Sequence, residues 1–389
     1  MNIRDKSLLK HYEWAGKIET KVKAGLQTQE DLMLAYTPGV AEACLEIEKD
    51  PNKSFLLTAR ANQVLVVTDG TAVLGLGDIG PLAGMPVMEG KAALFKHFGD
   101  VDCIPLCINS KDTEEIIHTI KLLEGNFAGI NLEDISAPRC FEIEKRLKEE
   151  LSIPVFHDDQ HGTAIVTAAA LINALKIVKK DLKDVNIVIN GAGAAGIAIA
   201  EFLLHLGSKN IVLVDRTGIL SKDTKQTNEA KDAIAQKTNP QLLKGDLSVA
   251  LKGADVFIGV SVGNIVTKEM IKLMKPDPIV FPLANPIPEI TPTLAKEAGA
   301  KVVGSGSNLY ENQINNALVF PGLFKGAILA KATKITYKMM ASAAYAIADY
   351  IKEELKPDFI IPRVLDLNVH KAVTMKVMET AILEGHIRK

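Results

Sequence analysis

The chain has 389 residues, more than a single domain of about 100–200 residues usually holds. Hydrophobic residues make up 47% of it and charged residues 24%, which excludes a largely disordered or fibrous chain. The formal net charge of −2 provides no bulk basic field for nucleic acid or an acidic membrane. We therefore expect an ordinary protein of two or three domains that binds a small molecule.

The N-terminus, residues 1–19, carries charges every few positions and no apolar stretch, so we expect no signal peptide and a cytoplasmic protein. The longest apolar stretch, residues 163–178, includes Asn173 and Lys176 and is shorter than a membrane span, which predicts a buried helix. The cysteines lack CxxC spacing, and we expect reduced thiols. They are Cys44, Cys103, Cys107 and Cys140.

Short apolar runs in the first half predict buried strands at residues 64–67, 104–108 and 153–156. Residues 112–124 and 138–150 have helical spacing, and Pro138 is tolerated near a helix start because its missing N–H costs little there.

Strands and helices alternate more regularly in the second half, which predicts a parallel, doubly wound sheet and an α/β fold. A long helix is expected over residues 162–178, and helices from residue 326 onward. Between them we expect strands at 186–190, 211–214, 255–260, 279–282 and 302–303, and a helix at 194–206.

The pattern GxGxxG occurs twice, and its context differs between the two copies. The copy at Gly191, Gly193 and Gly196 follows a strand and opens a helix, and Asp215 ends the next strand. This arrangement is typical of a dinucleotide site: the glycines bring backbone N–H groups up to the pyrophosphate, and the acidic side chain binds the ribose hydroxyls.

The copy at Gly75, Gly77 and Gly80 is followed at once by Pro81, and then by Gly84 and Pro86. We expect no helix to start there. The motif is interpreted as a loop that approaches another part of the site closely, with a tight structural turn as the alternative.

Asp215 favours NAD over NADP because a carboxylate repels a 2′-phosphate. Three cations follow it closely and leave NADP open, since any of them could pair with a phosphate. They are Arg216, Lys222 and Lys225.

Two acidic pairs, Glu133-Asp134 and Asp158-Asp159, each follow a short apolar run. Ligands of open α/β folds collect at the carboxyl ends of strands, and carboxylate oxygens suit Mg²⁺ or Mn²⁺. A zinc site built on His157 and His161 is the less favoured alternative, because no cysteine or third histidine is nearby in sequence. We expect these histidines to be hydrogen-bond partners behind the site or packed residues.

Taken together, these motifs resemble the malic enzyme family, and its short bacterial type in particular. They occur in the family's order and cover most of residues 36–330. The matching segments are YTPGVAEAC (36–44), TDGTAVLGLGDIG (68–80), PVMEGKAALFK (86–96), GINLEDI (129–135), VFHDDQHGTA (155–164), ANPIPEI (284–290) and NQINNALVFPG (312–322).

The resemblance implies oxidative decarboxylation of (S)-malate to pyruvate and CO₂, reduction of NAD(P)⁺, a requirement for Mg²⁺ or Mn²⁺, and a homodimer. It implies an N-terminal α/β catalytic domain over 1–164 and a Rossmann NAD(P)-binding domain over 165–389, which includes a helical tail at 326–389.

The resemblance also assigns roles to individual residues. Tyr36 matches the tyrosine that protonates the enolpyruvate carbon, and Lys91 the general base, whose pKa must be depressed for it to act as a neutral amine. The remaining matches are metal ligands Glu133, Asp134 and Asp159; Asp158 beside Lys91; Asn285 and Asn316 at substrate and nicotinamide; and Gly191, Gly193, Ala194, Ala195 and Gly196 at the cofactor.

The chain departs from the family at two places. Larger members have a substrate-binding arginine where this chain reads Thr71-Ala72-Val73, so we expect other groups, such as N–H groups of the 75–80 loop, to bind the carboxylate. Short members commonly read GTGRSDYPNQ where this chain reads GSGSNLYENQ over 304–313, with Ser307, Leu309 and Glu311 as the replacements. Substrate affinity or specificity could differ there.

Two other functions are also compatible with the sequence. One is a metal-dependent oxaloacetate decarboxylase with little redox turnover, which the intact glycine motif and Asp215 disfavour. The other is a nucleotide-binding sensor without catalysis, which would need neither Tyr36 nor Lys91.

Overall fold

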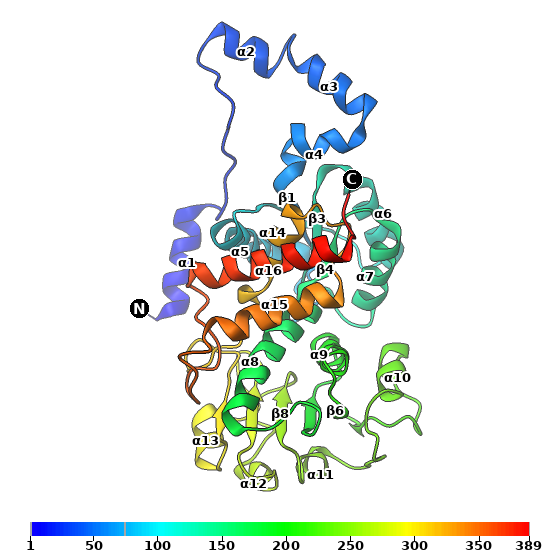
Figure 1. Cartoon of the computed structure of the whole chain (residues 1–389), viewed down its shortest axis with the longest axis vertical. Helices are drawn as coiled ribbons and strands as arrows, with labels where there is room; N and C mark the ends of the chain where they lie inside the picture. Colours follow the sequence, from blue (N-terminus) through cyan, green and yellow to red (C-terminus); the bar gives the residue numbers. More distant parts are fainter. Residues whose placement is uncertain (1, 74, 389) are drawn as a thin grey trace.

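Two β-sheets organise the chain, one above the other in Figure 1. The computed structural model describes residues 2–73 and 75–388. Leu74, which belongs to the 68–80 motif, lies outside the described residues.

The first sheet has four parallel strands in the order β2 (Asp102–Cys107), β1 (Gln63–Thr68), β3 (Gly129–Leu132) and β4 (Val155–His157). The helices that follow its strands are α5 (Pro81–Gly99), α6 (Thr113–Leu123) and α7 (Arg139–Glu150). Helices cover both faces of a parallel sheet, so the central strand is buried along its length rather than at alternate positions. The strands and the two helices predicted in this half are confirmed.

Helix α5 corrects one prediction. It begins at Pro81, directly after the glycine motif of residues 75–80, where no helix was expected. Proline suits the first turn of a helix because its fixed φ is helical and its missing N–H would have no partner there. Pro86, a turn further along, lies inside the same helix and does not end it.

The second sheet has six strands in the order β10 (Val302–Val303), β9 (Ile279–Pro282), β8 (Val256–Gly259), β5 (Asn186–Asn190), β6 (Asn210–Asp215) and β7 (Gly218–Ile219). Only β7 runs antiparallel to its neighbour among these described strands. The connecting helices are α9 (Ala194–His205), α10 (Glu229–Ala235), α11 (Leu247–Leu251), α12 (Lys268–Lys272) and α13 (Pro292–Glu297). The predicted parallel sheet is confirmed.

Helix α8 (Thr163–Val178) runs between the two sheets in Figure 1 and packs against α9 and α15 (Tyr337–Tyr350). The helical run 158–178 is the one candidate in the described chain that is long and apolar enough to cross a membrane. Most of it is buried inside the protein, as expected for the core helix predicted here.

The C-terminal helices return to the first sheet. Helices α14 (Phe320–Leu329) and α16 (Leu367–Glu384) both contact α5. The ring of Phe95 on α5 lies 4.6 Å from that of Phe320 and 5.3 Å from that of Phe324. The tail therefore joins both halves of the chain, since α15 packs on α8 and α14 and α16 pack on α5.

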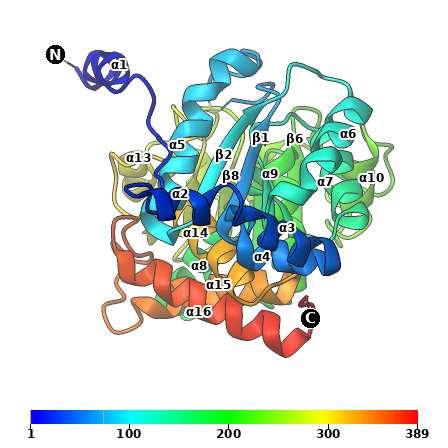
Figure 2. The same ribbon diagram turned by 90° about the horizontal axis from the view of Figure 1, so that it is seen from above.

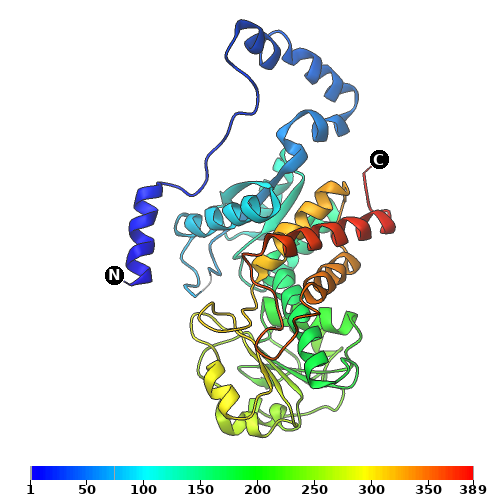
Figure 3. The same ribbon diagram turned by 60° about the vertical axis from the view of Figure 1, so that its left-hand side comes forward.

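An N-terminal arm, residues 2–49, contrasts with this body. It carries α1 (Ile3–Trp14), α2 (Gln29–Ala35) and α3 (Val40–Lys49), and no residue of these helices is buried. Figures 1 and 3 show α2 and α3 standing away from both sheets, and Figure 2 shows α1 projecting from the side. Short helices at 51–62, including α4 (Ser54–Leu57), lead from the arm into β1.

Candidate active site

The acidic pairs meet at the carboxyl ends of two neighbouring strands. Glu133 follows β3 and Asp158 follows β4, and the parallel register pairs Leu132 with His157. Carboxylate oxygens of Glu133, Asp134 and Asp159 lie within 4.8 Å of one another. We call these three residues the acidic cluster.

The acidic cluster fits a hard divalent cation. Glu133 and Asp134 are buried, and burial together with Asp159, Asp158 and Asp134 raises the pKa of Glu133 well above its usual value, although Lys91 opposes the rise. Burying carboxylates side by side is costly unless a cation balances them, and oxygen-only ligands are those that Mg²⁺ and Mn²⁺ prefer.

Local backbone geometry determines where the carboxylates of Asp134, Asp158 and Asp159 lie. Asp134 adopts a left-handed φ of 53°, its carbonyl accepts from the Ala72 N–H at 2.9 Å, and its own N–H donates to Asp159 Oδ2 at 2.8 Å. A π-type turn at Asp158–Gly162 follows β4 and leads into α8. A Cβ on Gly162 would lie 1.9 Å from Asp158 Oδ1, so glycine is required where the turn closes on that carboxylate.

Lys91, on α5, contacts the carboxylates of Asp158 and Glu133. Its Nζ lies 2.6 Å from Asp158 Oδ2 and 2.8 Å from Glu133 Oε1, and it stands 4.2 Å above the Phe320 ring. Burial lowers the pKa of Lys91, as expected from the sequence, but Asp158 and Glu133 outweigh burial and raise the pKa above its usual value. These contacts alone therefore do not produce the depressed pKa that was expected of Lys91.

The two asparagines lie on different loops. Asn316 begins a short helix before α14, and its Nδ2 donates to Asp158 Oδ2 at 2.6 Å. Asn285 follows β9, and its Nδ2 lies 3.4 Å from the carbonyl oxygens of Leu283 and Gly306.

The loop of residues 75–80 approaches the Asn285 segment closely. A Cβ on Gly75 would lie 3.3 Å from Pro286. Gly70, which precedes the loop, packs closely on its last residue, because a Cβ on Gly70 would lie 2.3 Å from the Gly80 carbonyl. The N–H groups of residues 76, 77, 79 and 80 all donate to carbonyls of Gly70 or Val73. Few N–H groups of this loop are thus free for the carboxylate role that we expected of them.

Tyr36 is not at the cluster. It lies between α2 and α3 in the N-terminal arm, with 67% of its surface exposed. The described chain, residues 2–73 and 75–388, thus brings Lys91, the acidic cluster, Asp158 and Asn316 together but leaves the tyrosine outside.

The second glycine motif has the geometry of a dinucleotide loop. A Cβ on Gly191 would lie 2.6 Å from the Val260 carbonyl, and one on Gly196 would lie 1.7 Å from the Gly191 carbonyl. A Cβ on Gly193 would meet nothing within 4 Å. Two of the glycines therefore allow tight packing, and the middle one leaves space for a ligand at the start of α9, where Ala194 and Ala195 form the first turn.

Asp215 ends β6, where the sequence predicts the ribose-binding carboxylate. Its partner is Lys231 on α10, which forms an ion pair with Oδ2, and not Lys222 or Lys225. Burial raises the pKa of Asp215, but Lys231 and the Arg216 N–H outweigh it and keep the pKa below its usual value. Sequence reasoning missed Lys231, because nothing in its spacing distinguishes it from other surface lysines.

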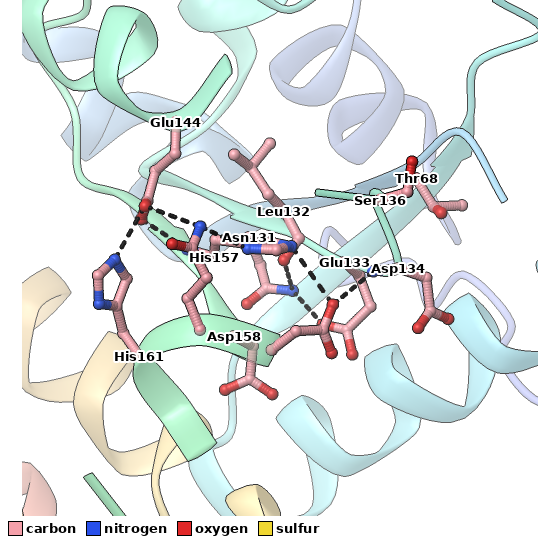
Figure 4. A network of polar contacts seen from close by, with 12 residues as sticks. Thr68, Asn131, Leu132, Glu133, Asp134, Ser136, Glu144, His157, Asp158 and His161 are labelled. Atoms are coloured by element: carbon pink, nitrogen blue, oxygen red, sulfur yellow. Dashed lines mark hydrogen bonds and ion pairs between the residues drawn. The ribbon is translucent and has the colours of Figure 1, made fainter. Parts of the chain in front are cut away.

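A buried polar network lies behind the acidic cluster. Figure 4 shows Glu144 at one end, Glu133 and Asp134 at the other, and His157 between them. The carboxylate of Glu144 accepts from the main-chain N–H of His157 at 3.0 Å and lies 2.8 Å from His161 Nε2, and the His157 ring Nδ1 lies 2.8 Å from Gln160 Nε2. Both histidines thus serve as partners behind the site, and the metal-competent group found among the described residues contains carboxylates alone. Sequence reasoning also missed Glu144, which looks like one more acidic residue of a charged helix.

Comparison with known proteins identifies the chain. The family model for the malic enzyme N-terminal domain matches residues 15–148, and the model for the malic enzyme NAD binding domain matches residues 160–382. The chain belongs to the malic enzyme family. The resemblance inferred from the motifs, the α/β fold and the assignment as an oxidoreductase of this family are thereby confirmed.

Individual relatives agree over the whole chain. It is 54% identical to the NAD-dependent malic enzyme of Geobacillus stearothermophilus and 50% identical to the bifunctional malic/malolactic enzyme of Bacillus subtilis, in each case over 100% of this chain and over 81% and 95% of those proteins. The crystal structure of the NAD-dependent malic enzyme from Thermotoga maritima has a TM-score of 0.93 and 51% identity, covering 96% of this chain and 98% of that one.

The loop at 304–313, where the chain departs from the motif common in the family, is held by its own contacts. Asn312 Nδ2 donates to the carbonyls of Val303 and Pro357 at 2.9 Å, and Glu311 pairs with Lys296 at 2.8 Å. Leu309 is exposed. The replacements at 309 and 311 thus lie on the outer side of an anchored loop.

Proposed function

We propose that this malic enzyme oxidatively decarboxylates (S)-malate to pyruvate and CO₂ with NAD⁺ as the favoured cofactor and Mg²⁺ or Mn²⁺ as the metal. The observation that carries the proposal is the buried ammonium of Lys91, in contact with Asp158 and Glu133 at the edge of the acidic cluster. A cation site, a proton-transfer pair and a dinucleotide loop in one chain are what this chemistry requires.

Glu133, Asp134 and Asp159 would hold the metal. When bound, the cation supplies a Lewis acid that withdraws electron density from the substrate oxygens, and the dinucleotide supplies the hydride acceptor. Gly191, Gly193, Ala194, Ala195, Gly196 and Asp215 are proposed to bind the dinucleotide. Asn285 and Asn316 are proposed to contact substrate and nicotinamide.

Lys91 and Asp158 are proposed as the pair that moves the hydroxyl proton. A lysine accepts a proton only when it is neutral, so the ammonium must first release one. Asp158 Oδ2, 2.6 Å from Nζ, can accept it, and burial raises the pKa of this carboxyl above its usual value even though Lys91 lowers it. The amine left behind can then take the proton of the malate hydroxyl.

Tyr36 is proposed to donate the final proton to carbon, and it does so in the site of a second copy of the chain. The arm that carries it has exposed apolar side chains on α1, α2 and α3, among them Leu8, Trp14, Met33, Leu34 and Leu45. Apolar side chains gathered in this way usually mark an interface. A homodimer in which each arm packs on the partner would bury them and would complete the site.

Mixed dimers test this arrangement. Lys91→Ala and Tyr36→Phe are each nearly inactive as homodimers under the proposal. A mixed dimer of the two holds one site with a native Lys91 and the partner subunit's Tyr36, so activity near half of the native value per mixed dimer is expected. If the tyrosine instead acts within its own chain, both sites of the mixed dimer carry a defect, and activity stays near zero.

The activity itself is tested with malate, Mn²⁺ and either NAD⁺ or NADP⁺, by following the absorbance of the reduced cofactor. Malate-dependent reduction with a preference for NAD⁺ is expected. Consumption of oxaloacetate without malate-dependent reduction would favour the oxaloacetate decarboxylase. Dinucleotide binding without turnover of any 2-hydroxy acid would favour the sensor.

Two broader points belong to the same proposal. We propose the domain limits 1–164 and 165–389, since α8 begins near their boundary and each side of it holds one sheet. We also propose a cytoplasmic location, because four cysteines all remain as free thiols.

A further inference from the structure

The carboxylate of Glu144 lies at the centre of the polar network behind the acidic cluster. Glu144 Oε1 accepts from the main-chain N–H of His157 at 3.0 Å and pairs with Lys148 Nζ at 2.7 Å. Its Oε2 lies 2.8 Å from His161 Nε2 and accepts from Gln160 Nε2 at 3.3 Å. Three of these four partners belong to residues 157–161, the segment that carries Asp158 and Asp159.

The chemistry of Glu144 fixes the orientation of Gln160. An ionised carboxylate only accepts hydrogen bonds, and the pKa of Glu144 is far below its usual value because His161 and Lys148 outweigh its burial. The side-chain atom of Gln160 that faces Glu144 must therefore be the NH₂ group.

Gln160 in turn fixes the tautomer of His157. The same Nε2 of Gln160 lies 2.8 Å from His157 Nδ1. An NH₂ group can only donate, so Nδ1 must accept, and the ring proton of neutral His157 is on Nε2. That nitrogen lies 3.3 Å from Asp159 Oδ2.

The consequence falls on Asp159, a proposed metal ligand. Oδ2 accepts from the main-chain N–H of Asp134 at 2.8 Å, and the ring Nε2 of His157 lies 3.3 Å from it without forming a hydrogen bond. One main-chain donor and the nearby His157 ring nitrogen thus both lie on the Oδ2 side of the carboxylate, which leaves Oδ1 for a metal. A histidine with the opposite tautomer would present a lone pair to Oδ2 and repel it.

We propose that Glu144, through Gln160 and His157, orients Asp159 for metal binding. Glu144, Gln160 and His157 are positioning residues in this scheme, and none of them touches the substrate. The inference rests on the proposed function only in taking Asp159 as a metal ligand. Partners behind a metal ligand typically change metal affinity by about 10–100-fold when removed.

Gln160→Leu is the direct test, because it removes the amide while keeping a side chain of similar size. We expect the Kd for Mn²⁺, measured by electron paramagnetic resonance without malate, to rise about tenfold or more. Glu144→Gln should raise it as well, since its amide can no longer direct the NH₂ group of Gln160. Glu142→Gln, an exposed charge on the same helix α7, is the matched control and should leave the Kd unchanged.

A second measurement reads the tautomer in the native, metal-free protein, and a variant is needed only to assign the signal. Nitrogen-15 chemical shifts of labelled histidine, with His157 assigned by a His157→Asn variant, should show the proton on Nε2 in the native chain. A proton on Nδ1 of native His157 would overturn the inference. So would a Gln160→Leu protein of native thermal stability whose Mn²⁺ Kd stays within twofold of the native value.

These outcomes are separable from those of the proposed function. Metal binding and the His157 tautomer are both read without turnover. A chain that fails to oxidise malate while Gln160→Leu still weakens Mn²⁺ binding would count against the activity and leave the positioning role intact.

Discussion

The acidic cluster and the N-terminal arm represent two ways of building one site. Glu133 and Asp134 of the cluster are buried, Asp159 is half-buried, and Lys91 of the same chain pairs with Glu133. The arm has helices without a buried residue and carries Tyr36, the proposed proton donor. Under the proposed function the difference separates binding from turnover, because the metal and cofactor sites would form within one copy, whereas the last proton transfer would depend on how two copies meet.

The largest effect is expected from Lys91→Ala. Loss of the proton-transfer group should reduce kcat by about a thousandfold, within the range for general acid–base groups. Binding of NAD⁺, followed by fluorescence titration, should persist because the dinucleotide loop lies in the other sheet. Lys96→Ala, an exposed lysine of the same helix, is the control. A kcat near the native value would remove Lys91 from the mechanism.

Asp159→Asn tests the cluster as a metal site. Replacing an ionised ligand by an amide should raise the Kd for Mn²⁺ about a hundredfold. Removing a residue that only supports a ligand typically changes metal affinity by about 10–100-fold, so a direct ligand should lie at the upper end of that range or above it. Equilibrium titration with Mn²⁺ measures it, with the exposed Asp184→Asn as control. Unchanged metal affinity would mean that the three carboxylates hold something other than the cation.

Leu34→Ser tests the arm. If α2 packs on a second copy, loss of one buried leucine should weaken the dimer by about 10–100-fold, since such burial is worth roughly 1.5–3 kcal/mol. Sedimentation at several concentrations measures the dissociation constant, and activity should return at high protein concentration. Leu122→Ser, equally exposed but on α6 of the body, should leave assembly unchanged. Unaltered assembly in the arm variant would argue that α2 does not bind a partner.

The smallest effect is expected at the cofactor. Asp215→Asn should lower kcat/KM for NAD⁺ about tenfold, because a charge-assisted hydrogen bond to a ribose hydroxyl is worth roughly 1.5–3 kcal/mol. It should also free the Lys231 ammonium from its ion pair with residue 215, which should reduce the preference for NAD⁺ over NADP⁺. Steady-state kinetics with both cofactors measure the ratio, and Asp223→Asn is an exposed control. An equal loss for both cofactors would mean that Asp215 plays no part in discrimination.

The sequence predicts the candidate site well where its polar residues directly follow buried strands. Glu133 and Asp158 follow apolar runs, and parallel strands bring their carboxyl ends to one edge, so their meeting follows from the pattern alone. The glycine motif before α9 is predictable for the same reason, because each glycine has a separate steric task.

Other features depend on tertiary packing and leave no local signal. In the sequence, Glu144 and Lys231 look like ordinary charged residues of helices. Only the folded chain buries Glu144 and pairs Lys231 with Asp215. Proline breaks a helix in its interior but suits the first turn, so Pro81 alone does not predict that α5 begins there. The raised pKa of Lys91 likewise depends on two carboxylates, distant in sequence, whose combined effect exceeds that of burial.

The contact of α14 with α5 has a consequence for how the protein is made. Phe95 packs on Phe320 and Phe324, and a Cβ on Gly99 would lie 2.7 Å from the Pro321 carbonyl, so these segments fit closely. On the ribosome, the first sheet emerges long before residues 320–329 do. The side of α5 that carries Phe95 must therefore stay uncovered while the second sheet is synthesised, and the first half of the chain reaches its final packing last.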